Sequence, residues 1–249
     1  AEVELDKMVG ILHRRMGNKM FDKRSVVQLL KELGRAKQNT EAIAVIQCLQ
    51  KQSLEMDIYL SSATMSICRK VSAWGQAVEL LNELAGKRVD IDTVIYNAAI
   101  SACEKAGQLP CALQLLRDMD DVRIERDTCT YNAAVSACEK VGDWLRALQL
   151  LREMAEVHVK RDNITYNAAI SACEKLKQWS QALQVLLEMA EVRVVRDTIT
   201  YNAAVSSCEK AGQWLQALRL LHEMDDARVE RNTITYNSAA SACEKAGQW

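Results

Sequence analysis

Proline and phenylalanine are nearly absent from this sequence. Its 249 residues include one proline, Pro110, one phenylalanine, and only 5% aromatic residues in total. β-Sandwiches and loop-rich enzymes commonly use more aromatic core side chains and more prolines in their turns. With 49% hydrophobic residues, the chain still has enough apolar material for a sizeable core. The composition therefore favours a helical protein.

The sequence also lacks an excess of charge of either sign and a long apolar run. It has 32 basic and 33 acidic side chains, so no global positive potential attracts nucleic acid or an anionic membrane. No hydrophobic stretch reaches the length of about 20 residues that a membrane-spanning helix needs. We therefore expect a soluble chain or a peripheral member of an assembly, in which any attraction for a polyanion is local.

Motifs for catalysis and metal binding are missing as well. No Ser/His/Asp or Cys/His arrangement, His-Glu-x-x-His motif or glycine-rich phosphate loop is found, and no Cys-x-x-Cys pair indicates a zinc site. The nine cysteines are an odd number, and six of them recur at one fixed spacing that is too wide for disulfides between neighbouring copies. We expect these six to be small buried residues in a protein of a reducing compartment. The sequence predicts no catalysis, no cofactor and no metal.

What the sequence does contain is an internal repeat of 35 residues. The pair Tyr-Asn begins at Tyr96 and returns four times at that interval, and Ser-Ala/Ser-Cys-Glu-Lys follows it in each copy. Such a period is the signature of a repeat architecture. The repeats are expected at 58–92, 93–127, 128–162, 163–197 and 198–232. The sequence thus predicts four well-formed repeats over 93–232, two divergent ones over 23–92, a half-repeat over 233–249, and an N-terminal helix over 1–22 that is a divergent repeat remnant.

Each repeat has the pattern of two helices. In the unit that starts at Thr128, Asp127 is placed to cap a first helix that runs to about Lys140, and Gly142 ends it. Ala147, Leu148, Leu150, Leu151 and Met154 then fall on one face of a second helix. A single hairpin cannot bury that face, whereas stacked hairpins can. The predicted fold is all-α, a right-handed α-solenoid (superhelix) of tandem antiparallel helix-turn-helix repeats whose first helices line the concave side.

These residues resemble the pentatricopeptide repeat family, with its 35-residue P-type repeats. The segment Thr-x-Thr-Tyr-Asn-Ala-Ala-Val-Ser-Ala-Cys-Glu-Lys-x-Gly-x-Trp, followed by Ala-Leu-x-Leu-Leu-x-Glu-Met, is similar to the family pattern in length and register, from about Asp22 onward. The resemblance implies a single-stranded RNA binder of mitochondria or chloroplasts that recognises about one base per repeat. It implies a role in RNA processing, stability or translation.

The resemblance also implies which residues contact RNA. The fifth and last residues of a repeat would contact the base edge, and here they are Asn97 with Asp127, Asn132 with Asp162, Asn167 with Asp197, and Asn202 with Asn232. In the family such pairs favour uracil or cytosine. The second residues would pack against the bases, and they are Val94, Cys129, Ile164 and Ile199. The lysines that would meet phosphate are Lys105, Lys140, Lys175 and Lys210, with Lys245 in the half-repeat.

Some features of the sequence leave alternatives open. Arginine replaces the family's proline before the closing acid, at Arg126, Arg161, Arg196 and Arg231, and the loop glycine is replaced at Arg123, His158, Arg193 and Arg228. A glutamate stands directly before each of the lysines. The Asn and Asp side chains can equally cap or bridge adjacent hairpins, and the lysines can form a solvated face. The alternative function is a structural scaffold subunit whose solenoid binds protein subunits of a large organellar assembly, such as a ribosome or a photosynthetic or respiratory complex.

Overall fold

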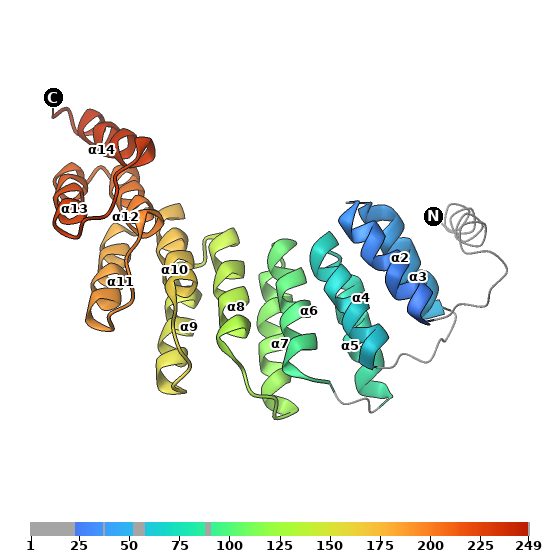
Figure 1. The fold of residues 1–249 in the computed structure, drawn as a ribbon. Coiled ribbons are helices and arrows are strands. Elements are labelled where there is room, and N and C mark those ends of the chain that lie inside the picture. The colour runs from blue at the N-terminus through green and yellow to red at the C-terminus, as the bar shows by residue number, and fades with distance from the viewer. Residues whose placement is uncertain (1–22, 37, 52–57, 88–90, 249) are drawn as a thin grey trace. The chain divides into compact units, whose positions relative to one another are not determined.

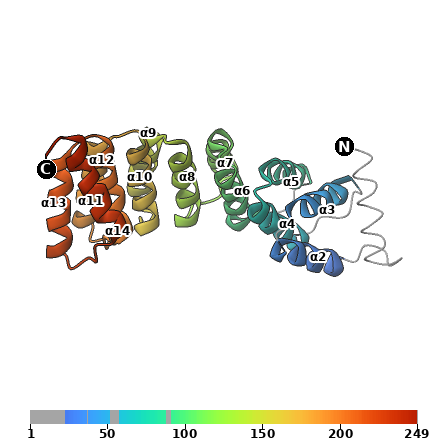
Figure 2. The same cartoon turned by 90° about the horizontal axis from the view of Figure 1, so that it is seen from above.

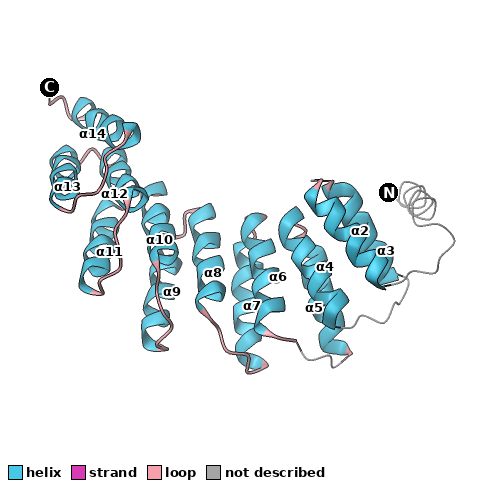
Figure 3. Cartoon of the chain, in the orientation of Figure 1, coloured by secondary structure: helices cyan, strands magenta, loops and turns pink. Residues whose placement is uncertain are grey.

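The structure is a computed structural model, and it describes residues 23–36, 38–51, 58–87 and 91–248. Every regular element in these residues is an α-helix, and there are thirteen of them (Figures 1 and 3). The first helices of the hairpins are α2 (Lys23–Arg35), α4 (Ile58–Val71), α6 (Thr93–Lys105), α8 (Thr128–Val141), α10 (Asn163–Lys175), α12 (Thr198–Lys210) and α14 (Thr233–Lys245). The second helices are α3 (Asn39–Lys51), α5 (Trp74–Gly86), α7 (Leu109–Asp121), α9 (Trp144–Glu156), α11 (Trp179–Glu191) and α13 (Trp214–Asp226). The helix expected over 1–22 lies outside the described residues.

The chain forms two compact units, Ala1–Arg126 and Asp127–Trp249, and each contains stacked hairpins. In the first unit α4 packs between α2 and α6, and in the second α10 packs between α8 and α12. A second helix packs against the first helix of its own hairpin and that of the next, as α9 does against α8 and α10. Figures 1 and 2 show the hairpins of each unit following one another in chain order. The predicted all-α fold of tandem helical hairpins is confirmed.

The first helices begin where a capping side chain stands. Asp92, Asp127, Asp162, Asp197 and Asn232 each accept a hydrogen bond from the backbone N–H three residues later. In four of these caps a threonine at that third position also accepts a hydrogen bond from the backbone N–H of the capping residue, which completes a capping box. The repeated Asp/Asn-x-x-Thr spacing therefore sets the start of these helices. Gly142 adopts φ 78° and ends α8, as the sequence predicts.

The core between the hairpins combines large side chains of the second helices with small ones of the first. Ala147, Leu150, Leu151 and Met154 of α9 are buried, whereas Leu148 is only partly buried. Facing first helices supply buried alanines and cysteines, and these small side chains allow the helices to approach closely. Five of the six repeated cysteines, Cys68, Cys103, Cys138, Cys173 and Cys208, are buried and unbridged, as expected, whereas Cys243 is unbridged but only partly buried.

In two connecting loops of the second unit, an arginine, a tyrosine and a glutamate join the loop to the next hairpin, whereas Arg231 of the last loop pairs with Asp225 of α13. Arg196, which stands where the family has proline, forms an ion pair with Glu223 of α13 and lies over the ring of Tyr201, 5.6 Å from its centroid. The Tyr201 hydroxyl donates a hydrogen bond of 3.1 Å to the same carboxylate. Burial, with the nearby Glu223 charge, raises the pKa of Tyr201 to about 12, so the phenol stays a donor. The same triad recurs at Arg161, Tyr166 and Glu188.

The turns after the second helices contain L-residues in the left-handed region. Val194 N–H donates to the carbonyl of Met189 at 2.9 Å and closes one such turn around Arg193. A left-handed conformation costs an L-residue about 1–2 kcal/mol, which glycine avoids. The residues in this conformation are Arg123, His158, Arg193 and Arg228, with φ of 57°, 56°, 56° and 54°. These four residues, which stand where the family has glycine, thus adopt a backbone conformation that glycine takes without strain.

Candidate nucleic-acid interface

The asparagines predicted to contact bases are joined to the capping residues of the next helix. Asn132 on α8 donates from its amide nitrogen to both carboxylate oxygens of Asp162, at 3.1 and 3.2 Å. Asn202 on α12 donates in the same way to Asn232, at 3.2 Å. Each pair therefore connects two neighbouring first helices. The structure brings the predicted partners of these two pairs together, and it also shows that both pairs bridge adjacent hairpins.

A buried threonine completes each of these contacts. The Thr200 hydroxyl lies 2.7 Å from the amide oxygen of Asn167 and 2.8 Å from the carboxylate of Asp197. Its one hydrogen can be donated to either oxygen. The hydroxyl also accepts the backbone N–H of Asp197 at 3.2 Å. Thr165 and Thr235 contact Asn132 and Asn202 equivalently. The amides of Asn132 and Asn202 are therefore held by hydrogen bonds at both nitrogen and oxygen. The amide of Asn167 is held at its oxygen by Thr200.

Hydrogen bonding also lowers the pKa of the acid in the pair. Partial burial by itself would raise the pKa of Asp197, but hydrogen bonds from Thr200 and from the Asn167 amide outweigh it and hold the pKa below its ordinary value. The carboxylate is therefore ionised at neutral pH. In that state both carboxylate oxygens can accept hydrogen bonds from the asparagine amide.

Aliphatic side chains at the second position of the repeats are exposed. Val94, Ile164 and Ile199 have 66%, 60% and 64% of their surface accessible, and Cys129 is also exposed. These side chains lie in the first turn of the first helices, three residues before the asparagines. An aliphatic side chain of this size is normally buried. A row of them beside polar amides forms a surface with both apolar and hydrogen-bonding character.

The lysines predicted to meet phosphate are exposed and lie at the ends of the first helices, where several are already engaged. Lys210 pairs with Glu174 of the preceding first helix at 2.7 Å, and Lys245 pairs with Glu209 at 2.9 Å. Lys175 donates to the carbonyl oxygen of Lys140, at the end of α8. Lys140 and Lys105 also make contacts within the chain. These lysines thus bridge stacked hairpins, and the charge available to a phosphate is reduced.

The remaining predicted residues lie on α6 of the first unit and at the start of α8 in the second unit. Val94, Asn97 and Lys105 lie on α6 of the first unit, whereas Asp127 caps α8 of the second. Sequence reasoning did not identify the threonines of the Asn–acid contacts or the glutamates that partner the lysines. The Asp/Asn-x-x-Thr motif, which recurs in the repeats, could have indicated the threonines. The Glu-Lys pair, which recurs in every first helix from α6 onward, could have indicated the glutamates.

The repeated buried thiols of the first helices are not reactive. Burial raises the pKa of Cys103 to about 12 and that of Cys173 to about 11, so both remain protonated. In the part of the chain that the structure describes, no group of three His, Cys, Asp or Glu side chains is arranged to hold a metal ion. No described helix combines the length and apolar character of a membrane span.

Comparisons with known proteins find solved structures of similar fold. The chain resembles the solved structure of the pentatricopeptide repeat protein PPR10 in complex with an 18-nt psaJ RNA element, with a TM-score of 0.67 and 23% identity over 99% of this chain and 34% of that one. It also resembles the PPR domain of Arabidopsis thaliana protein-only RNase P 1 in complex with tRNA, with a TM-score of 0.65 and 15% identity over 75% of this chain and 98% of that one. The chain spans about a third of the length of PPR10. A comparison with curated proteins found no match.

Family models match most of the repeat array. The model for the pentatricopeptide repeat domain matches residues 79–141, 114–176 and 149–211, and that for the PPR repeat family matches 196–245. These matches follow the same interval as the helices. The chain belongs to the pentatricopeptide repeat family.

Proposed function

We propose that this chain binds single-stranded RNA along its first helices, with about one base at each repeat and a preference for uracil-rich or other pyrimidine sequences. The observation that carries the proposal is the repeated pairing of an oriented asparagine amide with an exposed aliphatic side chain. Asn132 and Ile164 are one such set, and Asn167 and Ile199 are the next. An aliphatic surface can cover a base face while the amide contacts the base edge.

The hydrogen-bonding capacity of the amide supports this role. A carboxamide has two N–H donors and an oxygen with two lone pairs. Asn132 uses its nitrogen toward Asp162 and its oxygen toward Thr165, which leaves one N–H and one lone pair for a ligand. Uracil presents an N–H group between two carbonyl oxygens, and a donor next to an acceptor complements that edge. The preference for uracil over adenine rests on the family resemblance.

The neighbours with bound RNA support the same reading. One is PPR10 with an RNA element of 18 nucleotides, and the other is the PPR domain of protein-only RNase P 1 with tRNA. We propose that the present chain is likewise a binding module and not an enzyme, and that it acts in the processing, stability or translation of transcripts in a chloroplast or mitochondrion.

A titration with two homopolymers tests the proposal. Fluorescence anisotropy of labelled oligo-U and oligo-A strands, each measured at two salt concentrations, gives both the base preference and the number of phosphate contacts. We expect oligo-U to bind more tightly. Four free lysines would give a slope of log K against log salt of about −3 for a single strand. We expect a shallower slope, because Lys210 keeps Glu174 as a partner. Equal binding of both strands would refute the preference.

A scaffold that binds protein subunits is the second candidate. The observation that favours it is the pairing of lysines with glutamates, such as Lys245 with Glu209, where an RNA groove would keep its charges free. If neither strand binds at low salt, the RNA proposal fails and the scaffold is the function that remains.

A further inference from the structure

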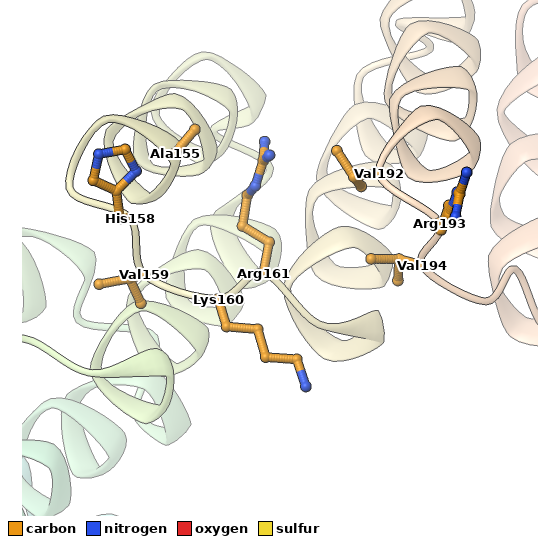
Figure 4. A pocket seen from close by; sticks show the side chains of 8 residues that line it. All are labelled: Ala155, His158, Val159, Lys160, Arg161, Val192, Arg193 and Val194. Atoms are coloured by element: carbon orange, nitrogen blue, oxygen red, sulfur yellow. The ribbon is translucent and has the colours of Figure 1, made fainter.

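A groove lies between two successive connecting loops of the second unit. One loop, residues 157–161, follows α9, and the other, residues 192–196, follows α11 (Figure 4). The groove has a volume of ≈ 430 Å³. Figure 4 shows the loops on opposite sides, with Arg161 between them. His158, Val159 and Lys160 line one side, and Val192, Arg193 and Val194 line the other.

The charge of these two loops differs from that of the other repeat loops. They carry Lys160, Arg161, Arg193 and Arg196 and no acidic residue. The loop 122–126 contains Glu125, and the loop 227–231 contains Glu230, at the position that Lys160 occupies. In a chain of net charge −1, this is a local concentration of positive charge.

Two of the four cations are available to a ligand. Arg161 and Arg196 are held by Glu188 and Glu223. The Lys160 and Arg193 side chains are exposed and have no ion-pair partner among the residues that the structure describes. The exposed acids on the neighbouring helices are Glu156 and Glu191, the last residues of α9 and α11, and they weaken the positive field without pairing with either cation.

The rest of the lining is aliphatic. Val159, Val192 and Val194 contribute to it, and the adjacent Val195 is 71% exposed, the highest value among the large hydrophobic side chains described. Valine side chains pack well against other aliphatic side chains. A groove lined by cationic and aliphatic side chains complements a segment in which acidic and aliphatic residues alternate.

We propose that this groove is a docking site for an extended acidic peptide segment of a protein partner, with acidic side chains at Lys160 and Arg193 and aliphatic ones on the valines. The site is separate from the Asn–acid contacts, although Lys160 lies two residues before Asp162. An RNA phosphate is therefore the competing ligand, and the experiment distinguishes the two.

The test uses a fluorescein-labelled twelve-residue peptide in which Asp or Glu alternates with Val or Leu. A matched peptide with lysines in place of the acids controls for apolar binding. We expect saturable binding of the acidic peptide only. Lys160→Glu with Arg193→Glu reverses the charge of both exposed cations, and it is expected to weaken the acidic peptide at least about tenfold, since two attractions become repulsions.

The control variant is Lys177→Glu, an exposed residue in the turn between α10 and α11. It changes the net charge in the same direction at another place, and we expect peptide affinity to stay within about twofold. Far-UV circular dichroism and urea unfolding confirm that the variants fold. Oligo-U affinity of the double variant is expected to be unchanged. The proposal is overturned if the peptide does not bind, if both variants weaken it equally, or if oligo-U is weakened as much as the peptide. If the unmodified chain binds no RNA, the proposed function is refuted and the peptide result still stands.

Discussion

Replacing Thr200 with valine separates the hydroxyl of the Asn–acid contact from the shape of the side chain. Thr200 is fully buried, and its hydroxyl contacts the Asn167 amide, the Asp197 carboxylate and the Asp197 backbone N–H. Valine fills the same volume, and the Thr200 backbone N–H can still donate to Asp197, a bond of 2.9 Å. The variant thus loses the bonds of one hydroxyl and leaves a backbone donor and an amide oxygen without this partner.

The expected cost follows from those lost contacts. A net hydrogen bond contributes about 0.5–1.5 kcal/mol, and a buried group left without a partner adds its desolvation cost. Because these groups are only partly buried, we expect Thr200→Val to lower the free energy of unfolding by about 1–2 kcal/mol. In a chain of this length each kcal/mol corresponds to a shift of about 2–4 °C in Tm. Asn167 also loses an orienting contact, so oligo-U preference should decrease.

Urea unfolding followed by circular dichroism at 222 nm measures this change, with Thr200→Ser as the matched control. Serine keeps the hydroxyl and loses one methyl group, so it should retain most of the stability and of the oligo-U preference. The slope of the unfolding curve must be compared too, because stacked repeats can lose two-state cooperativity. The reasoning is refuted if valine is within about 0.3 kcal/mol of the unmodified chain, or if serine is as destabilising as valine.

Three further variants test the loops, the caps and the arginine triad. Arg228→Gly relieves a left-handed residue at φ 54° and should raise the free energy of unfolding by about 0.5–1 kcal/mol in urea, whereas Arg228→Ala should not. Asp197 has a lowered pKa in the folded chain, so its carboxylate stabilises the fold above the unfolded pKa of about 4, and this contribution is lost as pH falls through the folded pKa. Asp197→Asn should therefore flatten the loss of stability between about pH 5 and pH 3. Glu188→Gln removes the charged partner of Arg161 and should cost about 1 kcal/mol in urea unfolding, whereas Glu191→Gln at the exposed end of the same helix should cost almost nothing.

The sequence predicted the hairpins well because the starts of the first helices and the apolar faces of the second helices are determined locally. Asp127 caps α8 through a side chain three residues from its donor, and Gly142 ends the helix through its own backbone freedom. Leu150, Leu151 and Met154 share a face because helical geometry alone puts them there. These features need no knowledge of how hairpins stack.

Contacts between hairpins depend on that stacking, and most of them could not be predicted. The ion pair of Arg196 with Glu223 spans 27 residues, and that of Lys210 with Glu174 spans 36. Neither spacing corresponds to a helix or turn period. The sequence suggested that the basic residues could serve phosphates, but the packing of the loop on the following hairpin gives Arg196 a carboxylate and a tyrosine ring as partners.

The central claim is that each asparagine amide recognises one base. The double variant Asn132→Thr with Asn167→Thr tests it most directly, with Asn163→Thr as control, since threonine already occupies the matching position at Thr128 and Thr198. Competition between labelled oligo-U and oligo-A strands should show the preference of the double variant move from pyrimidine toward purine, while the control keeps the original order. An unchanged preference in the double variant would show that these amides only join neighbouring hairpins.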